Sequence, residues 1–155
     1  MRFPVLAALL LLGSAAAAPA LAQDTPADNM EVLREKLRAD KKLLVAANMQ
    51  LTETEAKAFW PVYEEYQAGL AEMNRRTGLL IKRYADTGGK VAEADANAIM
   101  DEFVSIEKAR IAHIETFRPR FAKVLPAPKV ARYFQIENKI RAAVQYELAD
   151  GIPLM

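Results

Sequence analysis

The single histidine, His113, is the residue with the clearest capacity to bind a transition metal. An imidazole needs further nitrogen, sulfur or oxygen ligands that converge on the same ion. Glu107 and Glu115 lie within two helical turns of His113, but Ala109 and Phe117 occupy the positions four residues before and after it. The sequence therefore predicts a partly buried structural histidine and no metal site, unless a dimer brings two copies of His113 together.

Sequence patterns typical of catalysis are missing. The chain has no cysteine, no G-x-S-x-G sequence and no glycine-rich phosphate loop. The carboxylates of Glu64, Glu65, Asp101 and Glu102 have the spacing of solvent-facing helix positions. Because catalytic groups need partners that this sequence does not supply, we expect neither an enzyme nor a cofactor.

Side chains that could bind another polypeptide are one tryptophan and several basic residues. Phe59, Tyr63 and Tyr66 fall on seven-residue repeats and are expected in the core, whereas Trp60 does not and is the candidate for an exposed or interfacial aromatic. The basic candidates are Arg75, Arg76, Lys82, Arg83, Arg110, Arg118 and Arg120. They either form solvated, ion-paired helix faces or line a concave surface that attracts acidic or unfolded segments.

Trp60 and the first four basic candidates lie on a long helix that the sequence predicts to begin near Thr52. Thr52 and Glu55 are spaced as a capping box, in which each side chain accepts a backbone N–H of the other residue. The apolar face that follows repeats through Phe59, Tyr66, Met73 and Leu80 and through Tyr63, Leu70, Thr77 and Tyr84. The helix is predicted to continue to about Tyr84 with a kink at Pro61, a fresh start at Pro61 being the alternative.

Three further helices are predicted around this one. The first spans about 28–48, the third begins between Val91 and Asp95 after a turn at 86–89, and the fourth spans about 128–149. The apolar face of the third includes Ile99, Phe103, Ile106, Ile114, Phe117, Phe121 and Val124; that of the fourth is Val130, Phe134, Ile140, Val144 and Leu148. The fold class is therefore all-α, with two helix pairs around a long antiparallel hairpin whose arms bend at Pro61 and Pro119.

The ends of the chain predict export. Residues 1–22 have the charged start, the apolar run and the small-residue cleavage site of a signal peptide, with cleavage after Ala22. A retained membrane anchor is the alternative, but no later segment is apolar enough to span a bilayer. Residues 23–27 are expected to be a disordered tail, 28–150 a single helical domain and 151–155 an apolar C-terminal tail.

The charge balance does not favour a nucleic-acid partner. The whole chain has 21 basic and 20 acidic residues, and the two become equal once Arg2 is removed with the signal peptide. Export without a lipidated cysteine predicts a periplasmic location.

The segment Leu51-Thr52-Glu53-Thr54-Glu55 resembles the LTxxQ motif of the Spy/CpxP family of periplasmic stress proteins, with Glu55 in the glutamine position. The position of a second copy is held by Leu125-Pro126-Ala127-Pro128-Lys129, which lacks the capping residues. The Phe-Trp-Pro-Val-Tyr sequence at 59–63 marks a divergent subgroup. Membership would imply a cradle-like antiparallel dimer that binds unfolded proteins without ATP.

We therefore expect an exported chaperone-like or envelope-stress binding protein that contacts unfolded or envelope proteins, most simply as a homodimer. The alternative is a periplasmic sensor or adaptor, metal-responsive or not, that docks on a membrane signalling protein.

Overall fold

The computed structural model describes residues 39–152. The predicted signal peptide, the polar tail at 23–27, the predicted helix start at Asp28 and residues 153–155 lie outside this range. The described part is helical throughout: a helical segment at 39–49 precedes α2 (Glu53–Asp86), α3 (Glu93–Ala122) and α4 (Ala127–Gly151), and no strand occurs among these residues. The predicted all-α class is confirmed for this part of the chain.

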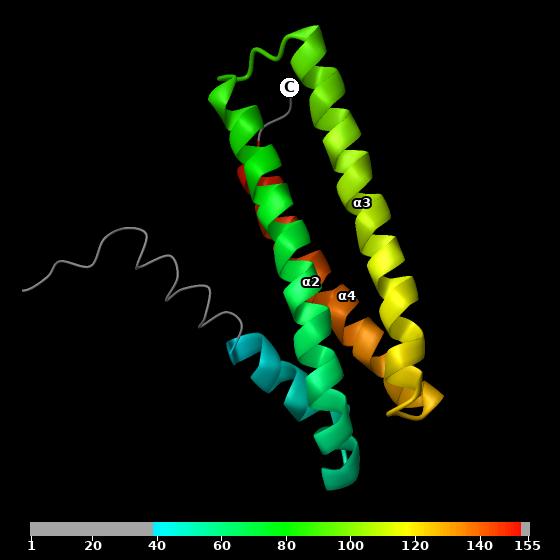
Figure 1. The fold of residues 1–155 in the computed structure, drawn as a ribbon. Coiled ribbons are helices and arrows are strands. Elements are labelled where there is room, and N and C mark those ends of the chain that lie inside the picture. The colour runs from blue at the N-terminus through cyan, green and yellow to red at the C-terminus, as the bar shows by residue number, and fades with distance from the viewer. Residues whose placement is uncertain (1–38, 153–155) are drawn as a thin grey trace, which may run out of the picture. The chain divides into compact units, whose positions relative to one another are not determined.

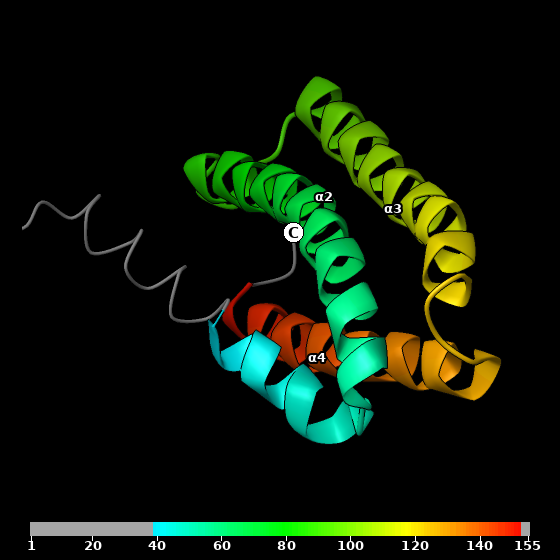
Figure 2. The same ribbon diagram turned by 60° about the horizontal axis from the view of Figure 1, so that its bottom comes forward.

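The start of α2 is fixed by the capping box. Glu55 N–H donates to Thr52 Oγ1 at 3.2 Å, and Thr52 N–H donates to Glu55 Oε2 at 2.8 Å. The helix continues through Pro61 rather than restarting there, and in Figure 2 its axis changes direction along its length. Its start and its end, two residues beyond Tyr84, agree with the sequence prediction.

Helices α2 and α3 form the predicted antiparallel hairpin (Figure 1). The connection uses Gly88 and Gly89, whose φ values of 58° and 80° lie in the left-handed region that glycine adopts without penalty. Helix α3 ends at Ala122, so Pro119 lies in its last turn. Pro119 cannot donate to the Glu115 carbonyl in the preceding turn, so any bend that it causes lies near the end of α3, and the matching bend of the two arms stays a prediction.

The segment 39–49 and helix α4 pack against the first half of α2 (Figure 2). Gln50 joins the segment to the cap of α2 with a φ of 48°, an uncommon value for a side chain other than glycine. The amine of Lys129, in the first turn of α4, donates to the Gln50 carbonyl oxygen at 3.0 Å. Gln50 therefore has a strained backbone conformation, and a hydrogen bond from α4 holds it.

The core lies where these helices meet and is rich in aromatic rings. Phe59, Tyr63 and Tyr66 are at most 2% exposed, as predicted from their repeat. They share the buried cluster with Tyr133 of α4 and Phe121 of α3, both 0% exposed. The rings meet largely edge to face, as aromatic quadrupoles prefer.

The predicted apolar side of α4 is only partly correct. Val130 is buried, and Phe134 and Ile140 are half-buried, but Val144 is 53% and Leu148 is 39% exposed. Tyr133, Ile136 and Glu137 are buried instead. The helix also includes Asp150 and Gly151, which were expected to end it.

Candidate functional site

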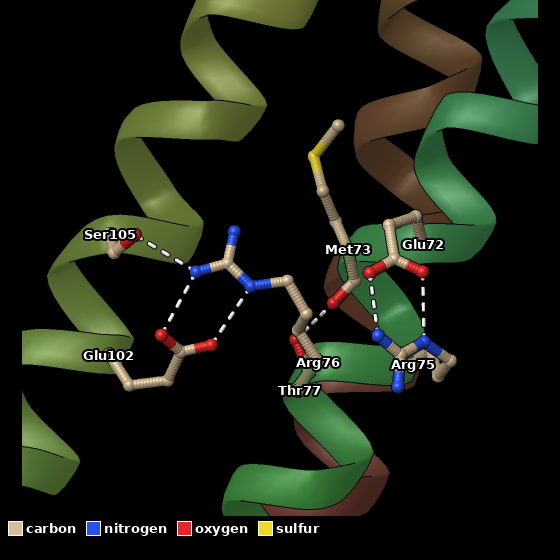
Figure 3. Close-up of polar contacts among 7 residues, drawn as sticks. All are labelled: Glu72, Met73, Arg75, Arg76, Thr77, Glu102 and Ser105. Carbon is tan, nitrogen blue, oxygen red and sulfur yellow. Dashed lines mark hydrogen bonds and ion pairs between the residues drawn. The ribbon is translucent and has the colours of Figure 1, made fainter.

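The basic candidates on α2 are ion-paired rather than free. Arg76 Nε and Nη2 each donate to Glu102 of α3 at 2.9 Å, and Nη2 also donates to Ser105 at 2.9 Å (Figure 3). Arg75 forms a two-point pair with Glu72 one turn earlier, at 2.7 and 2.8 Å (Figure 3). These contacts raise the pKa of both arginines and lower the pKa of both carboxylates.

The remaining basic candidates show the same arrangement with one exception. Lys82 pairs with Asp86 at 2.7 Å, Arg83 with Asp95 at 2.7 Å, Arg110 with Glu107 at 3.7 Å and Arg120 with Glu65 at 2.6 Å. The exception is Arg118, whose side chain is exposed. These ion pairs support the solvated-face interpretation of the basic residues over the interpretation as a concave lining.

Trp60 is half-buried and packs on the core instead of standing free. Its ring meets Phe59 at 5.0 Å and Tyr63 at 5.2 Å between centroids, both edge to face. The amine of Lys42, from the segment 39–49, lies 5.1 Å from the Trp60 ring centroid. Trp60 is therefore an internal contact between two helical segments, and its binding of another polypeptide stays a prediction.

The motif residues have structural roles. Leu51 packs against the core, and Lys129 of α4 donates to the Glu55 carboxylate of the cap. The hydrogen bond from Lys129, with a second from the Thr52 backbone, lowers the pKa of Glu55. The first motif thus ties the start of α2 to the start of α4. The second motif position supplies that lysine, and Pro126 caps α4 without a side-chain hydrogen bond.

His113 is a partly buried packing residue, as predicted. Its ring stacks on Tyr66 with centroids 4.8 Å apart, and Nε2 lies 3.0 Å from the Tyr66 carbonyl oxygen. A carbonyl only accepts hydrogen bonds, so Nε2 carries the proton. Across residues 39–152, no group of three or more histidine and carboxylate side chains is placed to hold a metal ion.

A polar network not anticipated from the sequence joins three helical segments. Lys41 Nζ donates to Gln67 Oε1 and to Glu137 Oε2, both at 2.8 Å. Gln67 Nε2 donates to Glu137 Oε1 at 2.9 Å and to the Tyr133 hydroxyl at 3.1 Å. Glu137 is 8% exposed, and burial with the nearby Glu137 charge raises the pKa of Tyr133. The only available sequence signal was a glutamate on the same face as Tyr133 and Ile140.

A second unanticipated feature is an apolar surface on α3. Met100, Phe103, Val104 and Ile111 are 41–59% exposed and share one face of the helix, and we call these four residues the α3 stripe. Phe103 was predicted in the core, but Ile99 and Ile106 are the buried residues of that part of α3. Two faces of α3 have apolar side chains in the sequence. Hydrophobic periodicity alone does not indicate which of them packs against α2.

Comparisons with known proteins add no relative. No family model matches the sequence, and no curated protein or solved structure is significantly similar to it. Within the described residues, no helix is both long enough and apolar enough to cross a membrane.

Proposed function

We propose that this chain is an exported, ATP-independent binding protein for non-native polypeptides in the periplasm. The observation that carries the proposal is the α3 stripe, which places four large apolar side chains over about three turns of an exposed helix face. Met100, Phe103 and Val104 are adjacent, and Glu107, paired with Arg110 and Arg141, separates them from Ile111. Grouped exposed apolar side chains of this kind commonly mark a binding surface. Methionine and phenylalanine suit a surface that meets many different sequences, because thioether and ring contacts adapt to varied partners.

The surroundings of the stripe fit weak and reversible binding. Asp101, Lys108 and Glu115 are exposed beside it and supply a polar rim of mixed charge. A mixed rim favours neither strongly acidic nor strongly basic clients. Client selection by the stripe would therefore depend on exposed apolar side chains, which folded proteins bury and unfolded proteins present.

Light scattering from a denatured model client tests this function directly. The mature protein in molar excess is expected to suppress aggregation, and Met100→Ser with Phe103→Ser is expected to remove most of that suppression. Leu79→Ser is the control, because Leu79 is 54% exposed on α2 and lies outside both the stripe and the end of α4. Undiminished suppression by the double variant, or none by the unaltered protein, would contradict the proposal.

A homodimer is part of the same proposal. Its support is the end of α4, where residues 142–151 are all exposed and include Val144 and Leu148. Three turns of helix without a buried side chain are marginal in water, so a second copy that covers them would stabilise the helix. Sedimentation equilibrium of the mature protein measures the mass, and a monomer at all concentrations would contradict the dimer.

Partner capture from envelope extracts separates the proposed function from the adaptor alternative. A diffuse set of bound proteins supports binding of non-native polypeptides. A single stoichiometric membrane protein would instead identify an adaptor or sensor.

A further inference from the structure

The helical segment 39–49, here called the strap, covers a groove formed by α2 and α4. Val45 and Met49 point into this groove with 0% exposure and belong to the same buried cluster as Phe59, Tyr63 and Tyr133. On the strap's outer side, Leu43 is 69% and Leu44 is 47% exposed. Two side chains therefore provide the fully buried apolar contact of this eleven-residue segment.

The other contacts of the strap are made by two lysines. Lys41 pairs with Glu137 and Gln67 on the groove floor. Lys42 pairs with Glu64 and places its amine over the Trp60 ring. Salt weakens the exposed Lys42–Glu64 pair and affects the largely buried Lys41–Glu137 pair less, so the strap depends on ionic strength through Lys42, more than the aromatic core does.

Part of the polar network on the groove floor does not involve the strap. Gln67 Nε2 donates to Glu137 Oε1 at 2.9 Å and to the Tyr133 hydroxyl at 3.1 Å. Departure of Lys41 therefore leaves a carboxylate that is held in place and open to another cation. Gln50, next to the end of the strap, has a φ of 48°, which residues other than glycine rarely adopt.

The strap displays the chemistry that the groove accepts. Lys41, Val45 and Met49 follow each other at four-residue intervals and so form one line along the helix. The groove supplies a carboxylate opposite the lysine and aromatic rings around the two apolar side chains.

We propose that the groove is a docking site for a basic amphipathic helix and that the strap is its resident autoinhibitory occupant. The fitting partner presents a basic residue followed by two apolar residues at four-residue spacing, and it binds by displacing residues 39–49. This site is separate from the α3 stripe, and its occupancy is measured below without any client protein.

Thiol labelling tests the proposal, since the chain has no cysteine of its own. Met49→Cys and Val45→Cys report opening of the strap, and Ile106→Cys in α3, at 2% exposure, reports opening of the hairpin core. We expect both strap thiols to label at least about tenfold faster than the core thiol, because a sub-global unit opens more readily than the whole fold. Added salt is expected to accelerate the strap thiols only.

A peptide with the sequence of residues 39–51 then tests recognition. In excess, it is expected to accelerate labelling of Met49→Cys several-fold by occupying the groove. A control peptide with aspartate in place of Val45 and Met49 is expected to have no effect. Circular dichroism confirms that each cysteine variant retains its helix content.

Two results would overturn the proposal. Strap thiols that label as slowly as the Ile106→Cys thiol would show that residues 39–49 do not open separately. Rapid labelling that neither peptide changes would show that the groove does not recognise such a helix. Both outcomes are independent of aggregation assays, so they leave the proposed binding of non-native polypeptides to its own test.

Discussion

At the residue scale, the most demanding contact is the one between His113 and Gly69. A Cβ atom at Gly69 would lie 2.2 Å from Cε1 of the imidazole and 2.7 Å from Nε2. The ring is held against α2 by stacking on Tyr66 and by the bond to the Tyr66 carbonyl. Glycine at this position therefore permits close packing of α2 and α3, although it weakens a helix interior.

Gly69→Ala is expected to destabilise the protein although alanine favours helices. Gly78→Ala is the matched control on the same helix, since a Cβ there meets no atom within 4 Å. We expect the control to gain up to about 1 kcal/mol of unfolding free energy from helix propensity. Urea denaturation measures the unfolding free energy of both variants. Equal gains would mean that the His113 ring moves aside without a loss of stability.

Glu55 makes stability depend on acid pH. Its pKa is lowered in the folded state, so its contribution is complete above the unfolded-state pKa of about 4.3 and is lost as pH falls through the folded pKa. Glu55→Gln keeps an acceptor for the cap and removes the charge that meets Lys129. We expect the variant's stability to decline less steeply below about pH 5, and parallel pH curves would refute this role.

At the element scale, the hairpin is joined by polar contacts as well as by its apolar face. Arg76 connects α2 to Glu102 and Ser105 of α3, whereas the neighbouring Arg75 pairs within α2 (Figure 3). Arg83 and Asp95 form a further connection near the turn. The cross-helix pairs restrict how α2 and α3 slide, and the pair within one helix does not.

Double-mutant cycles compare these two kinds of ion pair. The coupling between Arg76 and Glu102 is expected to exceed that between Arg75 and Glu72, because the former pair joins two helices and is less exposed to solvent. Alanine substitutions and urea midpoints at low salt provide the four corners of each cycle. Equal couplings would indicate that solvent screens both pairs alike.

Truncation of a side chain is expected to lower the unfolding free energy on the buried face of α3 and to leave it nearly unchanged on the exposed face. Ile106→Ala removes a side chain that is 2% exposed and should cost about 2–5 kcal/mol. Met100→Ala, at 52% exposure on the α3 stripe, should stay within about 0.5 kcal/mol. Chemical denaturation of both variants checks the contrast. A large loss for Met100→Ala would show that the stripe is covered in solution, as it would be in a dimer.

At the scale of the whole molecule, the sequence predicted the helix bounds and turns but not which helix faces are buried. The Thr52 cap, the glycine turn and the bounds of α2 depend on residues close in sequence, and the structure agrees with them. The exposure of Phe103 and Val144 depends on which helix lies opposite, and periodicity does not contain that information. Glu137 was missed because a carboxylate is buried only when its partners are present, and Lys41 lies 96 residues away.

The contacts of the strap also dictate an order of assembly. Residues 39–49 are made before the rest of the described chain, but their partner Gln67 follows Lys41 by 26 residues and Glu137 by 96. Helices α2 and α3 are consecutive in the chain, so they can pair before α4 is present. Among the described residues, the segment 39–49 therefore comes first in the chain but gains its contact to Glu137 only once α4 is present.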